Sequence, residues 1–122
     1  MSNTKHYDLE ERTLNFAKKV REFVNKLTKS IANFEDIKQL VRSSGSIGAN
    51  YIEANEALSK KDFYHRIKIS RKEAKESRYW LKLVETDNKK DLELRREELI
   101  QETTEFMKIF GSILEKKVNK EF

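Results

Sequence analysis

The chain has 122 residues, of which 39% are charged and 37% are hydrophobic, and its formal net charge is +5. This length favours a single domain, and the absence of cysteine excludes disulfide scaffolds, thiolate zinc sites and cysteine nucleophiles. No uncharged apolar run approaches the roughly 18 residues that a membrane-spanning helix needs, and the polar N-terminus lacks the apolar segment of a secretory signal. We therefore expect a cytoplasmic protein without a membrane partner.

The scarcity of helix-breaking residues predicts long helices, since the chain contains no proline and only three glycines. Apolar residues recur at steps of three and four, and no segment alternates as a strand would. This periodicity predicts four helices, over residues 9–28, 33–58, 60–86 and 89–118. Because the connections are short, consecutive helices should be antiparallel. We therefore predict an all-α fold in which residues 1–122 form one antiparallel, up-and-down four-helix bundle.

The first predicted helix carries a continuous apolar face, formed by Leu9, Phe16, Val20, Phe23, Val24 and Leu27. Arg12 falls within the same sector of the helix. A charge in this position needs either a partner or a route to solvent along its aliphatic stem. Since Arg12 is near the end of the helix, we expect its side chain to extend into solvent.

The second predicted helix contains two glycines in its middle. Asn33 and Asp36 have the spacing of an N-cap followed by an acidic third residue, so we expect the helix to begin there. Val41, Gly45, Gly48 and Ile52 then form a stripe that flanks the main apolar face. A glycine inside a helix costs about 1 kcal/mol relative to alanine. Either close packing inside the bundle or contact with another subunit could compensate for this cost.

A polar row also follows the second helix, and it consists of Gln39, Arg42, Ser46, Asn50 and Glu53. Steps of three and four place these side chains along one line of the helix. The row could be a solvated face, or it could form a hydrogen-bonded or pore-like surface.

The third predicted helix carries the whole surplus of positive charge. Residues 59–86 include nine basic and four acidic residues, whereas residues 1–58 and 87–122 have net charges of +1 and −1. Ser59 and Asp62 have the spacing of a helix cap. On one side, Ile69, Trp80 and Leu83 form a second apolar patch. Such a patch is either buried by another subunit, which we expect, or packed under the fourth helix.

The cations of this third helix share one face. At 100° per residue, seven of them fall within a sector of roughly 120°: Lys61, Lys68, Arg71, Lys72, Lys75, Arg78 and Lys82. Tyr64 and Tyr79 lie among them, while the acidic Asp62, Glu73 and Glu76 lie outside. Cations can contact a phosphate backbone, and interleaved aromatic rings can stack on bases. The alternatives are a solvated face, or a face paired with the acidic fourth helix of a neighbouring subunit.

Residues that could perform catalysis or hold a metal are poorly represented. Neither His6 nor His65 occurs in a Glu-x-x-His arrangement, so the di-metal bundle interpretation fails. Ser43, Ser44 and Ser46 have no histidine in the same segment, and a glycine-rich phosphate loop would need a strand. We therefore expect no enzyme activity, no catalytic residues, no metal site and no cofactor.

Two blocks of the sequence resemble a known family. The segments 42–54 (RSSGSIGANYIEA) and 72–81 (KEAKESRYWL) resemble the two recurrent blocks of the bacterial four-helix-bundle proteins encoded in intervening sequences of 23S ribosomal RNA genes. The same family includes the accessory variability proteins of diversity-generating retroelements. This resemblance implies a homopentameric ring with a basic surface that binds nucleic acid, and no known enzyme activity. One departure is Thr28, where many relatives have a proline after the first helix.

Together, the residues and the resemblance lead to two functional hypotheses. The first is a non-enzymatic nucleic-acid-binding accessory protein that uses the basic face of the third helix, with RNA favoured over DNA. The second is a structural or adaptor bundle whose basic face docks an acidic protein, such as a nucleic-acid-processing protein. In both, the subunit interface of the homopentamer is expected at Gly45, Gly48, Ile52, Ile69, Trp80 and Leu83.

Overall fold

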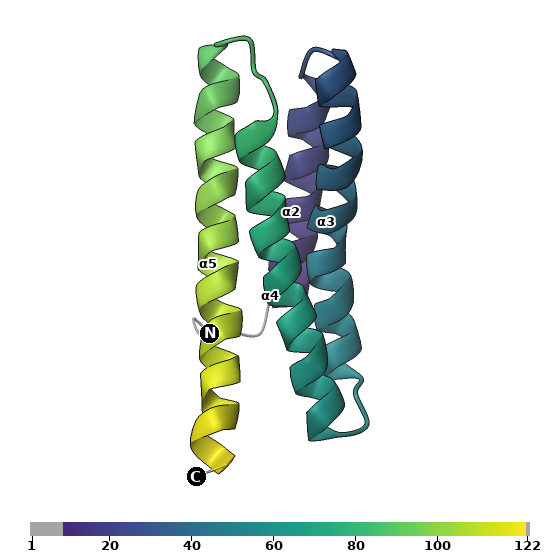
Figure 1. The fold of residues 1–122 in the computed structure, drawn as a ribbon, viewed down its shortest axis with the longest axis vertical. Coiled ribbons are helices and arrows are strands. Elements are labelled where there is room, and N and C mark those ends of the chain that lie inside the picture. Colours follow the sequence, from purple (N-terminus) through teal and green to yellow (C-terminus); the bar gives the residue numbers. More distant parts are fainter. Residues whose placement is uncertain (1–8, 122) are drawn as a thin grey trace.

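The computed structural model describes residues 9–121, with side chains placed for residues 9–116. The chain forms four helices in this range (Figure 1): α2 (Leu9–Asn25), α3 (Ile31–Asn55), α4 (Lys60–Leu83) and α5 (Lys90–Glu121). Residues 9–121 contain no strand. The prediction of an all-α, four-helix fold is therefore confirmed.

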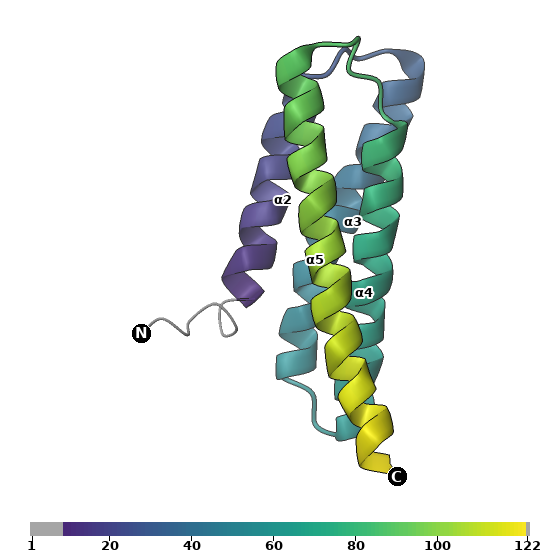
Figure 2. The ribbon, with the colours of Figure 1, turned by 90° about the vertical axis from the view of Figure 1, so that its left-hand side faces the viewer.

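The four helices run alternately up and down the long axis of the molecule. The α2–α3 and α4–α5 connections lie at one end, and the α3–α4 connection lies at the other (Figure 1). Each helix packs against the next in the chain, and α2 closes the bundle with a smaller contact to α5. Across the described residues, α2 does not contact α4, so these two helices lie diagonally opposite. Figure 2 shows that α2, with 17 residues against 32 in α5, extends along only part of the bundle.

The core forms where the predicted apolar faces meet. Phe106 of α5 is at its centre, with its ring edge-on to Phe16 at a centroid distance of 5.5 Å and stacked on Phe110 at 6.3 Å. The apolar face predicted for the first helix is buried. Leu58, the last residue of the predicted second helix, is 98% exposed because α3 ends three residues earlier, at Asn55.

Helix boundaries agree with the sequence where the capping residue was identified correctly. Ser59 caps α4 as predicted, since its side chain accepts a hydrogen bond from the Asp62 N–H. The predicted cap of α3 is wrong, because Ser30 accepts the N–H of Asn33 and the helix starts at Ile31. Asn33 is instead buried within the first turn.

α2 starts at Leu9 and α4 at Lys60 as predicted, and the remaining helix boundaries differ from prediction by one to three residues. α2 ends at Asn25 and not at residue 28. Just after the helix, the Lys29 ammonium donates to the carbonyl oxygens of Val24 and Leu27. α4 ends at Leu83, three residues before the predicted end. The turn that follows contains Asp87 and Asn88 with φ of 57° and 60°, values at which a helix cannot continue.

Arg12 does not extend into solvent as expected. Its Nε and Nη2 donate to the two carboxylate oxygens of Glu102 on α5, at 2.7 and 2.8 Å. The guanidinium carbon also lies 5.5 Å from the centroid of the Phe106 ring. A two-point ion pair between helices therefore satisfies the charge that falls in the apolar sector, and it supports the small α2–α5 contact.

Gly48 is explained by packing inside the bundle. A Cβ atom at this position would lie 2.6 Å from Thr13 Oγ1 of α2, closer than real Cβ atoms come. This contact favours packing inside the bundle for Gly48, and the placement of Gly48 at a subunit interface stays a prediction. Gly45 differs, since nothing lies within 4 Å of a Cβ built there.

Candidate nucleic-acid interface

The rotation of α4 about its axis is set by its buried stripe. Ile67, Ala74 and Leu81 are fully buried against the other helices, so the opposite side of α4 faces outward. The predicted cations lie on this outward side: Lys61, Lys68, Arg71, Lys72, Lys75 and Lys82 are exposed, and Arg78 is half-buried. Among the two aromatic residues, Tyr79 is 58% exposed and Tyr64 is half-buried. We call the seven cations with these two tyrosines the basic face of α4.

The cations of the basic face form no ion pairs with the side chains that the structure describes. In residues 9–116, ion pairs within 4.0 Å involve other cations, namely Arg12, Lys38, Arg42, Arg95 and Arg96. Glu73 and Glu76 of α4 both turn toward Arg42 of α3. Glu73 and Glu76 therefore neutralise an arginine of the neighbouring helix, and within residues 9–116 they form no ion pair with the basic face.

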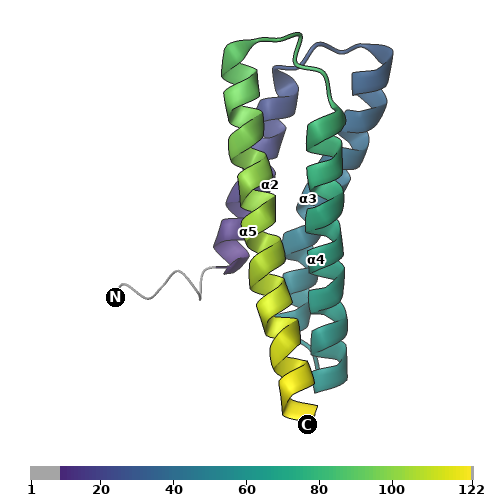
Figure 3. The same ribbon diagram turned by 60° about the vertical axis from the view of Figure 1, so that its left-hand side comes forward.

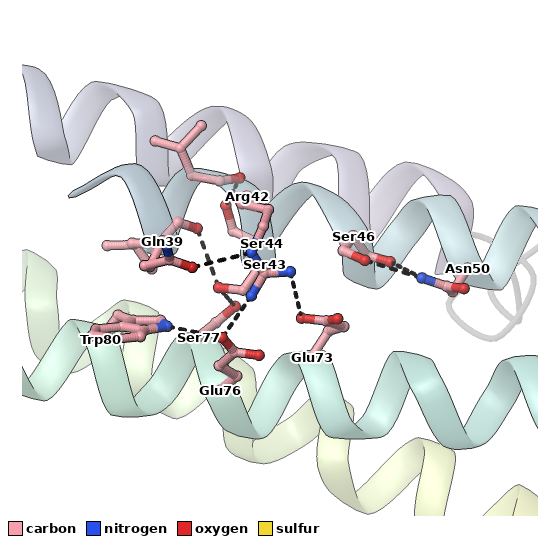
Figure 4. Close-up of polar contacts among 12 residues, drawn as sticks. Gln39, Arg42, Ser43, Ser44, Ser46, Asn50, Glu73, Glu76, Ser77 and Trp80 are labelled. Carbon is pink, nitrogen blue, oxygen red and sulfur yellow. Dashed lines mark hydrogen bonds and ion pairs between the residues drawn. The ribbon is translucent and has the colours of Figure 1, made fainter. Parts of the chain in front are cut away.

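A polar network joins α3 and α4 (Figure 4). The Arg42 guanidinium donates to Glu76 Oε2 at 2.5 Å and to Glu73 Oε1 at 3.4 Å, while its Nε donates to Gln39. The indole N–H of Trp80 donates to the same Oε2 of Glu76 at 3.2 Å. Burial raises the pKa of Glu76, but the hydrogen bonds from Trp80 and Arg42 outweigh it and hold this pKa below 4.5.

The polar row of α3 makes hydrogen bonds within the bundle. Arg42 bonds to α4 as described above. Further along the row, Arg66 of α4 donates to the side-chain oxygen of Asn50, whose amide group donates to Ser46. Between these contacts, the buried hydroxyl groups of Ser43 and Ser77 are 2.8 Å apart. Small and polar side chains therefore line the α3–α4 contact, and Gln39, Arg42, Ser46 and Asn50 find partners within the chain.

The apolar patch predicted on α4 lies on the α3 side. Trp80 is half-buried, packs against the core and bonds to Glu76, so part of its role is inside the chain. Ile69 is half-buried, and Leu83 is 47% exposed. On α3, Ile52 is 46% exposed. Ile52 and Leu83 are thus the large apolar members of the predicted interface that remain most accessible.

A groove runs between α4 and α5, beside the basic face. Figure 3 shows these two helices side by side along their length. The groove has a volume of about 770 Å³ and is lined by residues of both helices: Arg71, Arg78, Thr104, Met107, Lys108, Gly111, Ser112, Leu114 and Glu115. Sequence reasoning missed Lys108, because the fourth helix as a whole is slightly acidic. Only the antiparallel pairing of α4 with α5 brings Lys108 beside the arginines of α4.

No group of three or more His, Asp or Glu residues in the described part of the chain could hold a metal ion. His65 is exposed on α4, and His6 lies outside the described residues. Among residues 9–121, no helix is both long enough and apolar enough to cross a membrane.

Comparison with known proteins agrees with the resemblance seen in the sequence. The family model described as the 23S rRNA-intervening sequence protein matches residues 5–112. A crystal structure of a protein of unknown function from the S23 ribosomal protein family of Bacteroides thetaiotaomicron is 33% identical, with a TM-score of 0.74. The match covers 86% of this chain and 96% of that one. No curated protein matches the chain. With a family model matching most of its length, the chain belongs to the 23S rRNA-intervening sequence protein family.

Proposed function

We propose that this protein is a non-enzymatic accessory protein that binds nucleic acid through the basic face of α4. The observation that carries this proposal is that the seven cations form no ion pairs with the side chains described in residues 9–116, although acidic residues lie on the same helix. Surface lysines and arginines that are not neutralised within the chain remain available for a polyanion. Neutralising phosphates releases condensed counterions, which gives such a face affinity for any nucleic acid.

Self-association would multiply this face. We propose that the protein assembles as a homopentameric ring in the cytoplasm, as the family resemblance implies, with Ile52 and Leu83 at the contact. Their side chains are 46% and 47% exposed, although both are large and apolar. A ring that repeats the basic face in each subunit would form a broad positive surface that concentrates polyanions. RNA is favoured over DNA because the family is named for ribosomal RNA.

The proposal is tested by removing charge from the basic face alone. The variant carries glutamine in place of four exposed lysines of α4: Lys68, Lys72, Lys75 and Lys82. The probe is a fluorescein-labelled single-stranded oligouridylate, measured by anisotropy over a range of salt concentrations. Wild-type affinity should fall log-linearly with salt, and the variant should bind more weakly and with a flatter slope. A DNA probe of the same length measures the preference for RNA.

The control removes the same charge from α2, which lies diagonally opposite α4. It carries glutamine in place of four exposed cations in or just after that helix: Lys18, Lys19, Arg21 and Lys26. This control should retain most of the wild-type affinity. If the α4 variant binds as tightly as the control, the basic face is not the binding surface. If the wild type binds no RNA or DNA but binds an acidic protein, the adaptor hypothesis replaces the proposal.

A further inference from the structure

We infer that the α4–α5 groove seats the phosphodiester backbone of the bound nucleic acid, so that two helices hold it and not α4 alone. This inference rests on the proposed function and specifies where the strand lies. The groove is lined by Arg71 and Arg78 from α4 and by Lys108 from α5, against a single acidic residue, Glu115, among the lining residues that the structure describes. The groove is therefore the place where two cations of the basic face of α4 lie beside a cation of α5.

The two arginines suit a phosphate chain. Arg71 and Arg78 are seven residues apart on one helix, which places their Cα atoms about 10.5 Å apart along its axis. Neither guanidinium forms an ion pair with the described side chains, and Arg78 Nη1 has only a long contact of 3.5 Å to Thr104 Oγ1. A guanidinium offers two parallel N–H donors to a phosphate, a geometry that lysine cannot reproduce.

α5 adds donors on the opposite wall of the groove. Lys108 is exposed and forms no ion pair within residues 9–116, and Ser112 presents an exposed hydroxyl group one turn further along α5. Thr104 differs because its hydroxyl hydrogen is already used in a bond to the Ile100 carbonyl oxygen. The hydroxyl group can therefore only accept a hydrogen bond from Arg78. Glu115 follows Ser112 and therefore lies toward one end of the groove, while the segment from Thr104 to Ser112 contributes no acidic lining residue.

Gly111 keeps the groove open between these walls. Its backbone does not require glycine, because no glycine of the described residues has positive φ. A Cβ atom at Gly111 would lie 3.6 Å from Arg71 Nε, in ordinary contact, so alanine would fit and a larger side chain would occupy the space beside the guanidinium. The absence of a side chain leaves room for a ligand atom next to Arg71.

The experiment fills the groove without changing any charge. Gly111→Leu is compared with Gly111→Ala, using the same fluorescein-labelled oligouridylate. We expect Gly111→Ala to bind within about twofold of wild type, and Gly111→Leu to lose about tenfold or more in affinity, since a blocked guanidinium loses a charge-assisted hydrogen bond. Circular dichroism and sedimentation velocity verify that both variants keep the fold and the assembly of the wild type.

A second variant tests the groove independently, in case Gly111→Leu does not fold. The double substitution Arg71→Lys with Arg78→Lys keeps both charges and removes the forked donors, so it should also weaken binding, while Arg21→Lys on α2 should not. Wild-type affinity in Gly111→Leu or in the double arginine variant would overturn the groove assignment. That result leaves the proposed function standing if the four-lysine variant of α4 still loses affinity. The proposed function fails separately, when the four-lysine variant binds like its α2 control.

Discussion

Asn33 holds both polar groups of the Glu85 backbone. Its side-chain Nδ2 donates to the Glu85 carbonyl oxygen at 2.8 Å, and its Oδ1 accepts the Glu85 N–H at the same distance. The same Nδ2 also donates to the Thr28 carbonyl oxygen at 2.9 Å. One buried amide therefore ties the α2–α3 connection to the α4–α5 connection at one end of the bundle.

Replacing Asn33 should destabilise the protein strongly, because its side chain is buried and fully hydrogen-bonded. Asn33→Ala removes three hydrogen bonds and leaves backbone groups of Thr28 and Glu85 without their partner, so we expect a loss of about 2–4 kcal/mol in the free energy of unfolding. Asn33→Asp should cost at least as much, because a carboxylate cannot donate to the two carbonyl oxygens. Urea denaturation measures both. The exposed Asn15→Ala should change stability by less than about 0.5 kcal/mol, and an equal loss there would contradict this assignment.

Replacing each of the two glycines of α3 by alanine should change the free energy of unfolding in opposite directions. Gly48→Ala forces a Cβ against Thr13, whose hydroxyl group is held by the carbonyl oxygens of Leu9 and Glu10, so we expect a loss of about 1–3 kcal/mol. Gly45→Ala meets no atom and should stabilise the helix by about 0.5–1 kcal/mol. Thermal and urea unfolding distinguish the signs. Thr13→Ala should recover much of the Gly48→Ala loss, and its failure to do so would refute the contact.

Glu76 should contribute stability that is lost in acid. Its hydrogen bonds from Trp80 and Arg42 outweigh burial, so its pKa in the folded protein is below 4.5, its ordinary value. Around these acidic pH values the unfolded state therefore binds more protons than the folded state. The contribution of Glu76 to the free energy of unfolding is complete above its unfolded pKa and is lost as the pH falls through its folded pKa. Glu76→Gln should flatten this acid limb of a curve of unfolding free energy against pH. The exposed Glu22→Gln serves as the comparison, and equal curves for wild type and Glu76→Gln would contradict the assignment.

Assembly is best tested at exposed apolar residues. Trp80 packs against its own core and bonds to Glu76, so Trp80→Ala would alter the subunit itself as well as any contact. Ile52→Asp and Leu83→Asp change side chains that are about half exposed, and they should leave the helix content unchanged while shifting the protein toward monomer. Sedimentation velocity measures this shift, with Leu14→Asp on α2 as the matched control. A monomeric wild type at micromolar concentration would exclude the ring.

Local features of the fold follow from sequence because they depend on neighbours along one helix. The apolar repeat identified four helices and the buried face of the first, and Ser59 with Asp62 marked the start of α4. The same reasoning placed the seven cations of the basic face in one sector. One error occurred where a side chain could serve two roles. Asparagine is a common helix-capping residue, but the buried hydrogen bond from Asn33 to the Glu85 backbone is available only in the folded bundle.

Contacts between helices were decided by the tertiary structure. Arg12 pairs with Glu102, which is 90 residues away, and Gly48 meets Thr13 of another helix. Lys108 joins Arg71 in one groove because α4 and α5 are antiparallel neighbours in a particular register. The sequence by itself determined the helices, their faces and the place of the net charge, since a period of 3.6 residues is a local property. It did not determine which atoms meet across the bundle, because that depends on how far each helix is shifted and rotated when all four faces pack together.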